Sequence, residues 1–233
     1  MRWRPGPYWL GDEPLFPPAE CAHESGLVAV GGRLEPEWLL TAYRQGIFPW
    51  PSSEVEPMLW FSPDPRCVLV PSRIHVSRKL ARTLRRETFT VRFDSDFEGV
   101  IRACGQVPRP DQDGTWVTEP MIAAYRRLHA LGHAHSVETW RDGRLVGGIY
   151  GVALGGAFFG ESMFHRESDA SKVAMVALAR RLEAWGYAML DCQVENEHLL
   201  SMGAESIPRG RFLEELAAAL RLPGRPAPWP TEP

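Results

Sequence analysis

The chain has 233 residues, of which 44% are hydrophobic and 24% charged, and its formal net charge is −3. This length allows one large domain or two unequal ones and is sufficient for a substantial core. Because the net charge is slightly negative, any nucleic-acid-binding surface has to be a local basic patch. No apolar run approaches the roughly 20 residues of a membrane-spanning helix, and the N-terminus lacks the apolar segment of a signal peptide.

The four cysteines are widely spaced and form no CxxC pair. This spacing argues against a structural zinc site and against a redox-active dithiol. Since reduced cysteines are typical of the cytosol, we expect a cytoplasmic protein. The predicted elements leave no apolar helix face without a partner, so we also expect a monomer.

The first part of the chain is rich in proline, glycine and tryptophan, and residues 1–32 are expected to lack regular structure. Pro36 suits a first helical turn and Gly46 a helix end, which predicts a short helix between them. A connector rich in proline and aromatic residues follows. We therefore predict a small N-terminal domain of residues 1–64 and a catalytic domain of residues 65–233.

The second domain is predicted to begin with the strand CVLVP and with a helix that Ser77 can cap. A strand, FTVRF, and two helices follow, the second beginning at Thr118. HSVETW and RLVGGIYGV are predicted to form a β-hairpin, with AFFGESMF as a third strand. A long helix capped by Asp169, the strand AMLDCQV and two short helices complete the chain. This order predicts an α+β fold with a mixed sheet, similar to the N-acyltransferase (GNAT-like) folds.

Polar and ionisable groups interrupt two of the apolar strands. Glu161 lies in the middle of FFGESMF, and Asp191 and Gln193 lie in MLDCQV. A buried carboxylate is costly unless it is paired or neutralised, so these positions are candidates for chemistry. Asp191 and Gln193 are expected on one sheet face, where with Glu161 they could orient an amine and stabilise a tetrahedral intermediate. The alternative for Glu161 is an edge-strand carboxylate that faces water or pairs with an arginine.

Other catalytic patterns do not fit the sequence. His129 and His133 have zincin spacing, but Ala130 replaces the required glutamate and Gly132 ends the helix, so no metal is expected. Ser162 does not lie in a G-x-S-x-G motif, and no phosphate-binding loop occurs. Where CoA-dependent acyltransferases have a glycine-rich turn before the long helix, this chain has HRESDASK. We therefore expect no cofactor and an acyl donor other than CoA.

A basic helix is the strongest local charge signal, with five basic residues within nine positions and Glu87 as the acidic neighbour. Phosphate neutralisation is one hypothesis, and an ordinary solvated helix face is the alternative. Aromatic residues in loops can stack unpaired bases, although domain packing explains most of them here. The basic residues are Arg78, Lys79, Arg82, Arg85 and Arg86.

The chain resembles the leucyl/phenylalanyl-tRNA–protein transferases in six ordered segments: GLVAVGGRLEPEWLLTAYRQGIFPW, WFSPDPR, GTWVTEPMIAAYRRLHALGHAHSVETW, LVGGIYGV, FFGESMF and DCQV. The resemblance covers residues 26–212. It implies a cytoplasmic aminoacyltransferase that moves Leu or Phe, with Met as a further candidate, from Leu-tRNA or Phe-tRNA to proteins. The acceptor would be the α-amino group of a protein that begins with Arg or Lys, which marks that protein for degradation by the N-end rule.

The resemblance also implies roles for individual residues. Asp191 and Gln193 would orient and polarise the attacking amine and the ester carbonyl, and Glu161 would line the same cleft. The basic helix would contact the tRNA acceptor arm. The 3′-terminal adenosine would be held by Trp50, Trp116 and Tyr125. The aminoacyl side chain would enter a pocket of Ile149, Phe158, Phe159, Met175 and Leu178. Relatives carry Met in place of Ile149 and Phe in place of Leu178, which leaves the preference between Leu and Phe open.

Two other functions remain open at this point: a CoA-dependent N-acetyltransferase of the same fold, and a non-catalytic tRNA-binding module. Binding of acetyl-CoA would favour the first. Binding of tRNA without transfer, and without preference for an aminoacylated 3′ end, would favour the second. Because salt weakens RNA binding with or without catalysis, only a transfer assay separates the two RNA hypotheses.

Overall fold

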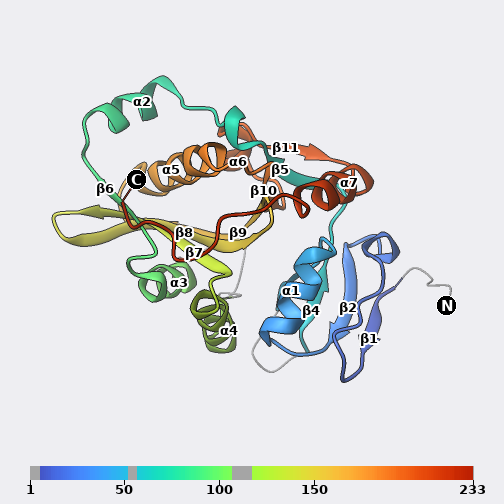
Figure 1. The fold of residues 1–233 in the computed structure, drawn as a ribbon. Coiled ribbons are helices and arrows are strands. Elements are labelled where there is room, and N and C mark those ends of the chain that lie inside the picture. The colour runs from blue at the N-terminus through green and yellow to red at the C-terminus, as the bar shows by residue number, and fades with distance from the viewer. Residues whose placement is uncertain (1–5, 52–56, 107–116, 233) are drawn as a thin grey trace.

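The computed structural model describes residues 6–51, 57–106 and 117–232. Within these residues, an N-terminal part built on a small sheet packs against a larger part built on a second sheet (Figure 1). The elements of the N-terminal part are β1 (Tyr8–Leu10), η1 (Ala19–Cys21), β2 (Leu27–Gly31), α1 (Pro36–Arg44), β3 (Phe48–Pro49) and β4 (Leu59–Phe61). The strand order in the small sheet is β1-β2-β4-β3.

The larger sheet carries most of the remaining chain. Its strands are β5 (Arg66–Leu69), β6 (Thr90–Phe93), β7 (Ala134–Arg141), β8 (Arg144–Leu154), β9 (Ala157–His165), β10 (Met189–Gln193) and β11 (Glu205–Ile207). Their order is β11-β5-β10-β9-β8-β7-β6, and only β9 and β10 pair in parallel among these described strands. The α+β class with a mixed sheet, predicted from the element order, is therefore confirmed.

Helices cover both faces of the larger sheet (Figure 1). They are η2 (Pro71–Arg73), α2 (Arg78–Arg85), α3 (Phe97–Gly105), α4 (Glu119–Ala130), α5 (Ala170–Ala184), α6 (Glu197–Ser201) and α7 (Arg209–Ala219). Two adjacent glycines of β8 show that helices lie on both faces of the sheet, because neighbouring positions face opposite sides of a strand. A Cβ atom on Gly147 would meet Ala170 of α5 at 2.6 Å, and one on Gly148 would meet Val100 of α3 at 3.1 Å. Glycine thus lets α5 approach one face of the sheet and α3 the other.

Two of the three side chains predicted to cap a helix make a capping hydrogen bond. The hydroxyl of Ser77 accepts a hydrogen bond from the Leu80 N–H at 3.2 Å, and that of Thr118 accepts one from Met121 at 3.5 Å. Asp169 occupies the N-cap position of α5 as predicted, but it has φ of +69° and its side chain makes no capping hydrogen bond. Its carboxylate accepts a hydrogen bond from the Thr83 hydroxyl at 3.1 Å instead, which joins α2 to the start of α5.

The prediction that residues 1–32 lack regular structure is wrong for β1 and β2. These strands gain their hydrogen bonds from each other and from β4, about thirty residues further along the chain, which a local pattern does not show. β11 was likewise not predicted.

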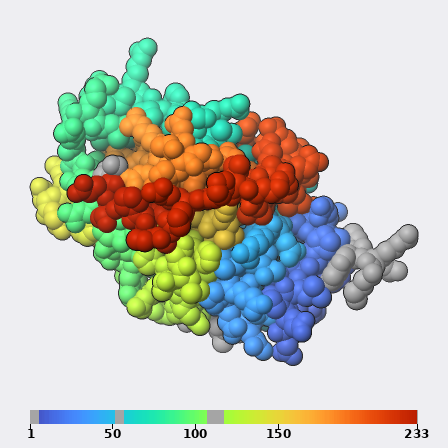
Figure 2. All heavy atoms as spheres, viewed as in Figure 1, coloured from blue at the N-terminus to red at the C-terminus, as the bar shows by residue number. Residues whose placement is uncertain are grey.

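The larger core cluster contains residues of both parts, so the domain division at residue 64 stays a prediction. In Figure 2 the N-terminal part (blue) packs against α4 (yellow-green), and the C-terminal tail (red) crosses the face of the molecule. The described helices include none that is long and apolar enough to span a membrane.

Candidate active site

A cavity of about 700 Å³ lies where the N-terminal part meets β9 and β10. Residues 48–50 form one wall, and the other walls come from the central strands together with α5 and α6. Such a volume is within the usual range for small-molecule sites. Five of the predicted site residues line it: Trp50, Ile149, Glu161, Met175 and Gln193.

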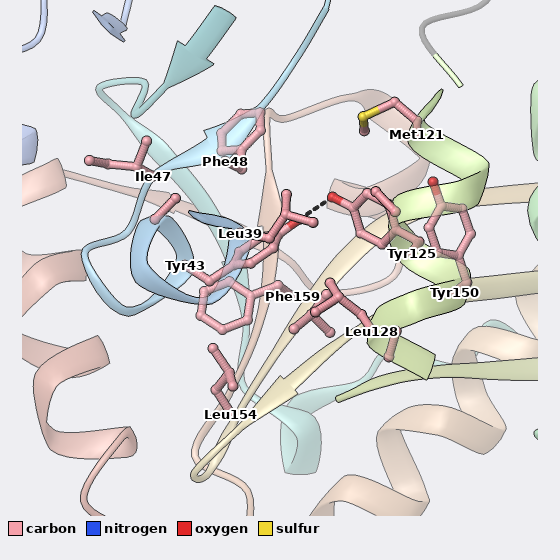
Figure 3. Close-up of a cluster of buried hydrophobic side chains, with 14 of the residues drawn as sticks. Leu39, Tyr43, Ile47, Phe48, Met121, Tyr125, Leu128, Tyr150, Leu154 and Phe159 are labelled. Atoms are coloured by element: carbon pink, nitrogen blue, oxygen red, sulfur yellow. Dashed lines mark hydrogen bonds between the residues drawn. The ribbon is translucent and has the colours of Figure 1, made fainter. Parts of the chain in front are cut away.

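Glu161 is the buried acid of this cavity, with only 7% of its surface exposed. Its Oε1 accepts a hydrogen bond from Nε2 of Gln193 at 2.8 Å, and its Oε2 accepts one from the Tyr125 hydroxyl at 2.8 Å. The Tyr125 hydroxyl also forms a hydrogen bond with the hydroxyl of Tyr43 (Figure 3). Glu161 is therefore buried, and among the described residues it pairs with no arginine, in contrast to the alternative considered from the sequence.

Burial raises the pKa of Glu161 from its ordinary value of 4.5 to about 7, and the negative charge of Asp191 acts in the same direction. Hydrogen bonds from Tyr43, Tyr125 and Gln193 oppose this shift without cancelling it. Burial, and then the charge of Glu161, raises the pKa of both Tyr43 and Tyr125 well above 10, so both hydroxyls keep their protons. The cluster therefore holds a carboxyl group that can gain or lose a proton near neutral pH.

Asp191 occupies a different environment, in a buried ion pair. Arg66 donates from Nε to Oδ1 at 2.8 Å and from Nη2 to Oδ2 at 2.6 Å, and both side chains are 0% exposed. The guanidinium group lies between the rings of Phe48 and Phe212, 4.7 and 4.5 Å from their centroids. The Gln193 backbone N–H also donates to Oδ1 of Asp191, at 2.9 Å. Both carboxylate oxygens are thus occupied, and Asp191 does not line the cavity.

The end of β10 departs from regular strand geometry. Gln193 has φ of +63°, and the pairing of β10 with β5 shifts register between Asp191 and Gln193. The prediction that these two residues share one sheet face assumed that side chains alternate regularly along the strand. The shift in register interrupts that alternation. The three polar residues are nevertheless linked in series, since Asp191 holds the backbone of Gln193 and the Gln193 side chain holds Glu161.

Other predicted site residues lie away from the cavity. Phe158 and Phe159 are buried, the first against Trp229 and the second against Tyr43, at centroid distances of 5.8 and 5.0 Å. Leu178 is buried in the core on α5, and Tyr125 is also fully buried, behind Glu161. None of these four side chains lines the cavity. Trp116 is outside the described residues.

The structure adds Tyr43 and Arg66, which the sequence did not suggest as site residues. Tyr43 lies on the buried face of α1, where an aromatic residue is expected for packing alone. Arg66 is the first residue of a short strand, and nothing in its neighbourhood predicts that an arginine is fully buried. Only the unusual carboxylate in β10 indicated that a cation was needed nearby.

The predicted basic helix is α2. All five of its basic residues are exposed, and none of them belongs to an ion pair within the described part of the chain. Leu80 anchors the opposite side of the helix in the core. In Figure 1, α2 lies at the periphery, above α5. The described residues contain no group of three or more His, Cys, Asp or Glu side chains that could hold a metal ion.

Comparison with known proteins gives weak structural and strong sequence similarity. The L-PGS structure from Bacillus licheniformis aligns with a TM-score of 0.41 at 11% identity, covering 73% of this chain and 54% of that one. A GCN5-related N-acetyltransferase from Kribbella flavida gives a TM-score of 0.39 at 12% identity, covering 73% and 60% of the two chains.

Two family models match the chain: "Leucyl/phenylalanyl-tRNA protein transferase N-terminal domain" over residues 32–64, and "Leucyl/phenylalanyl-tRNA protein transferase" over residues 68–217. A protein of the latter name from Myxococcus xanthus is 57% identical over 224 residues, covering 95% of each chain. Its counterpart from Thiobacillus denitrificans is 58% identical, covering 92% of this chain and 94% of the relative. These matches confirm the resemblance found in the six sequence segments, and the chain belongs to the leucyl/phenylalanyl-tRNA protein transferase family.

Proposed function

We propose that this protein transfers Leu or Phe, with Met as a further donor, from aminoacyl-tRNA to the α-amino group of proteins that begin with Arg or Lys. The acceptor is thereby marked for N-end-rule degradation in the cytoplasm. Membership of the family supports the reaction class. The observation that carries the proposal for the site is the buried Glu161, bonded to Gln193 and Tyr125 at the wall of the cavity.

In this reaction the acceptor amine attacks the ester carbonyl of the aminoacyl-tRNA. A C–N bond forms, the C–O bond to the terminal ribose breaks, and the proton lost by the amine ends on the ribose hydroxyl. The donor is an activated ester, so the energy for the new peptide bond is already present. Glu161 is suited to take the proton from the amine and pass it to the leaving oxygen, because a pKa of about 7 makes both steps accessible.

Gln193 and Asp191 contribute in different ways. The Gln193 amide faces the cavity and is oriented by Glu161, so it can bind the amine or the carbonyl oxygen of the ester. Asp191 is bound to Arg66 and to the backbone of Gln193, which supports a positioning role rather than proton transfer. These proposed roles differ from the expectation based on the sequence, in which Asp191 and Gln193 orient the amine and the carbonyl and Glu161 only lines the cleft.

The donor is proposed to enter the same cavity. Ile149 and Met175 supply apolar walls for an unbranched or aromatic side chain, and Met163 lines the cavity beside them. A misplaced methylene group in such a pocket changes the activation free energy by about 1–3 kcal/mol, so shape selection among donors is moderate. Trp50 is proposed to contact the terminal adenosine together with Trp116. The exposed basic residues of α2 are proposed to contact the acceptor arm, with the protein acting as a monomer.

The test is transfer of labelled Leu, Phe and Met from their tRNAs to a peptide that begins with Arg. Glu161→Gln should lower kcat by about 100-fold or more, the usual contribution of a proton-transfer group. Glu205→Gln is the matched control, because Glu205 is exposed on β11 and does not line the cavity. Undiminished transfer by Glu161→Gln would exclude it as the base. Absence of transfer from all three tRNAs by the unmodified protein would refute the proposed function itself.

A further inference from the structure

Basic side chains stand on three elements that contribute walls to the cavity, namely α6, the start of α5 and the end of β9, and we refer to this part of the molecule as the rim. His198 lines the cavity, and its Nε2 atom is buried without a hydrogen-bond partner in the part of the chain that the structure describes. Lys172 lies in the first turn of α5, and His165 ends β9. Lys172 stands one helical turn before Met175, and both Met175 and His198 line the cavity. Burial lowers the pKa of His198, and the charges of Lys172 and His165 act in the same direction.

Within the described residues, no carboxylate forms an ion pair with Lys172 or His198. None of the ion pairs among the described residues includes Lys172, which is half-buried. Glu197 precedes His198 and also lines the cavity, yet it is exposed and pairs with no cation within the described residues. A half-buried lysine and a buried ring nitrogen without partners can both be satisfied by an anion that approaches along the rim.

A hydrogen bond joins the basic helix to the segment just before Lys172. The Thr83 hydroxyl of α2 donates to the carboxylate of Asp169 at 3.1 Å, and Asp169 stands three residues before Lys172. The exposed cations of α2 are thus joined to the helix that carries Lys172, and His198 lines the cavity that contains Glu161. Proteins that bind single-stranded nucleic acid use such a basic track to follow the phosphate backbone.

We propose that this track is the path of the single-stranded 3′ end of the donor tRNA, and that Lys172 and His198 contact the phosphodiester groups next to the aminoacylated adenosine. The inference depends on the proposed function, because it assigns how the tRNA donor reaches the cavity. The protonated amine of Lys172 contributes a point charge, and the His198 ring contributes an N–H donor to a phosphate oxygen. The track thereby positions the donor without touching the ester.

The experiment compares two donors with the same aminoacyl group: Phe-tRNA, and phenylalanyl-adenosine, which has the terminal nucleoside but no phosphate. Lys172→Gln should raise the KM for Phe-tRNA about tenfold and make its dependence on salt shallower by about 0.7 in logarithmic slope. His198→Gln should also raise that KM. Lys172→Gln should change neither the KM for phenylalanyl-adenosine nor the kcat with either donor, because Lys172 does not line the cavity.

Two further variants make the result specific. Arg180→Gln removes an exposed cation from the same helix, two turns away from Lys172, and should leave both KM values unchanged. Lys172→Arg retains the charge and should recover most of the affinity for Phe-tRNA, which separates charge from packing. Thermal unfolding of each variant shows whether the fold is intact.

Equal increases in KM for both donors, or no increase for Phe-tRNA, would overturn the assignment of Lys172 and His198. An increase in KM for Phe-tRNA alone supports the assignment. If the unmodified protein transfers from neither donor, the proposed function fails. If it transfers from both and the variants behave like it, only the path along the rim is wrong.

Discussion

Glu161 links the stability of this protein to pH. Burial raises its pKa from 4.5 to about 7, so the folded state holds the proton more tightly than the unfolded state does. The protonated carboxyl group therefore stabilises the fold at low pH, and this contribution is lost as the pH rises through about 7. The two pKa values differ by about 2.5 units, and each unit corresponds to about 1.4 kcal/mol, so the total loss is about 3 kcal/mol.

Glu161→Gln removes this titration and keeps the size of the side chain and one oxygen acceptor. The free energy of unfolding, measured by urea denaturation between about pH 4.5 and pH 8, should therefore fall less steeply in the variant than in the unmodified protein. Relative to that protein, the variant should gain about 3 kcal/mol across this range. Burial also raises the pKa of Glu138, but that group titrates in both proteins and cancels in the difference.

The same substitution separates stability from activity. If Glu161 accepts the proton of the amine, kcat/KM of the unmodified protein should rise with pH through about 7, whereas the variant should lose this limb together with most of its activity. Parallel stability curves for the two proteins would show that the carboxyl group does not titrate with a raised pKa. The assignment of Glu161 as a base tuned by burial would then be refuted.

Three other predictions concern the ion pair, the cavity and the basic helix. Arg66→Met should lower the free energy of unfolding by about 3–5 kcal/mol, because Asp191 would remain buried without its partner; a loss below about 1 kcal/mol in urea denaturation would contradict this. Ile149→Ala should enlarge the cavity and raise kcat/KM for Phe-tRNA relative to Leu-tRNA by about tenfold, and an unchanged ratio would exclude Ile149 from donor selection. Arg82→Gln combined with Arg85→Gln should reduce the dependence of log KM on log salt for Phe-tRNA by about 0.7–0.9 for each phosphate that the variant no longer neutralises. The same slope in both proteins would mean that α2 does not contact RNA.

Local sequence determined most elements of the larger part and the unusual positions. The caps at Ser77 and Thr118 depend on residues within three positions of each other, so they are visible in the chain itself. Periodicity and element order were sufficient for the α+β class with a mixed sheet, because helices and strands have different repeat lengths. Glu161 was found because a carboxylate within an apolar strand is anomalous wherever that strand lies in the fold.

Tertiary structure decided what each unusual residue contacts. Arg66 and Asp191 are 125 residues apart, and no local rule predicts that they meet. The irregular end of β10 turns Gln193 toward Glu161. Regular strand alternation would instead have placed Gln193 on the same sheet face as Asp191. Hydrophobicity predicted that the core residues are buried, but not whether each one faces a cavity or the packed interior. That choice depends on how sheets and helices pack, and packing joins residues that are distant in the chain.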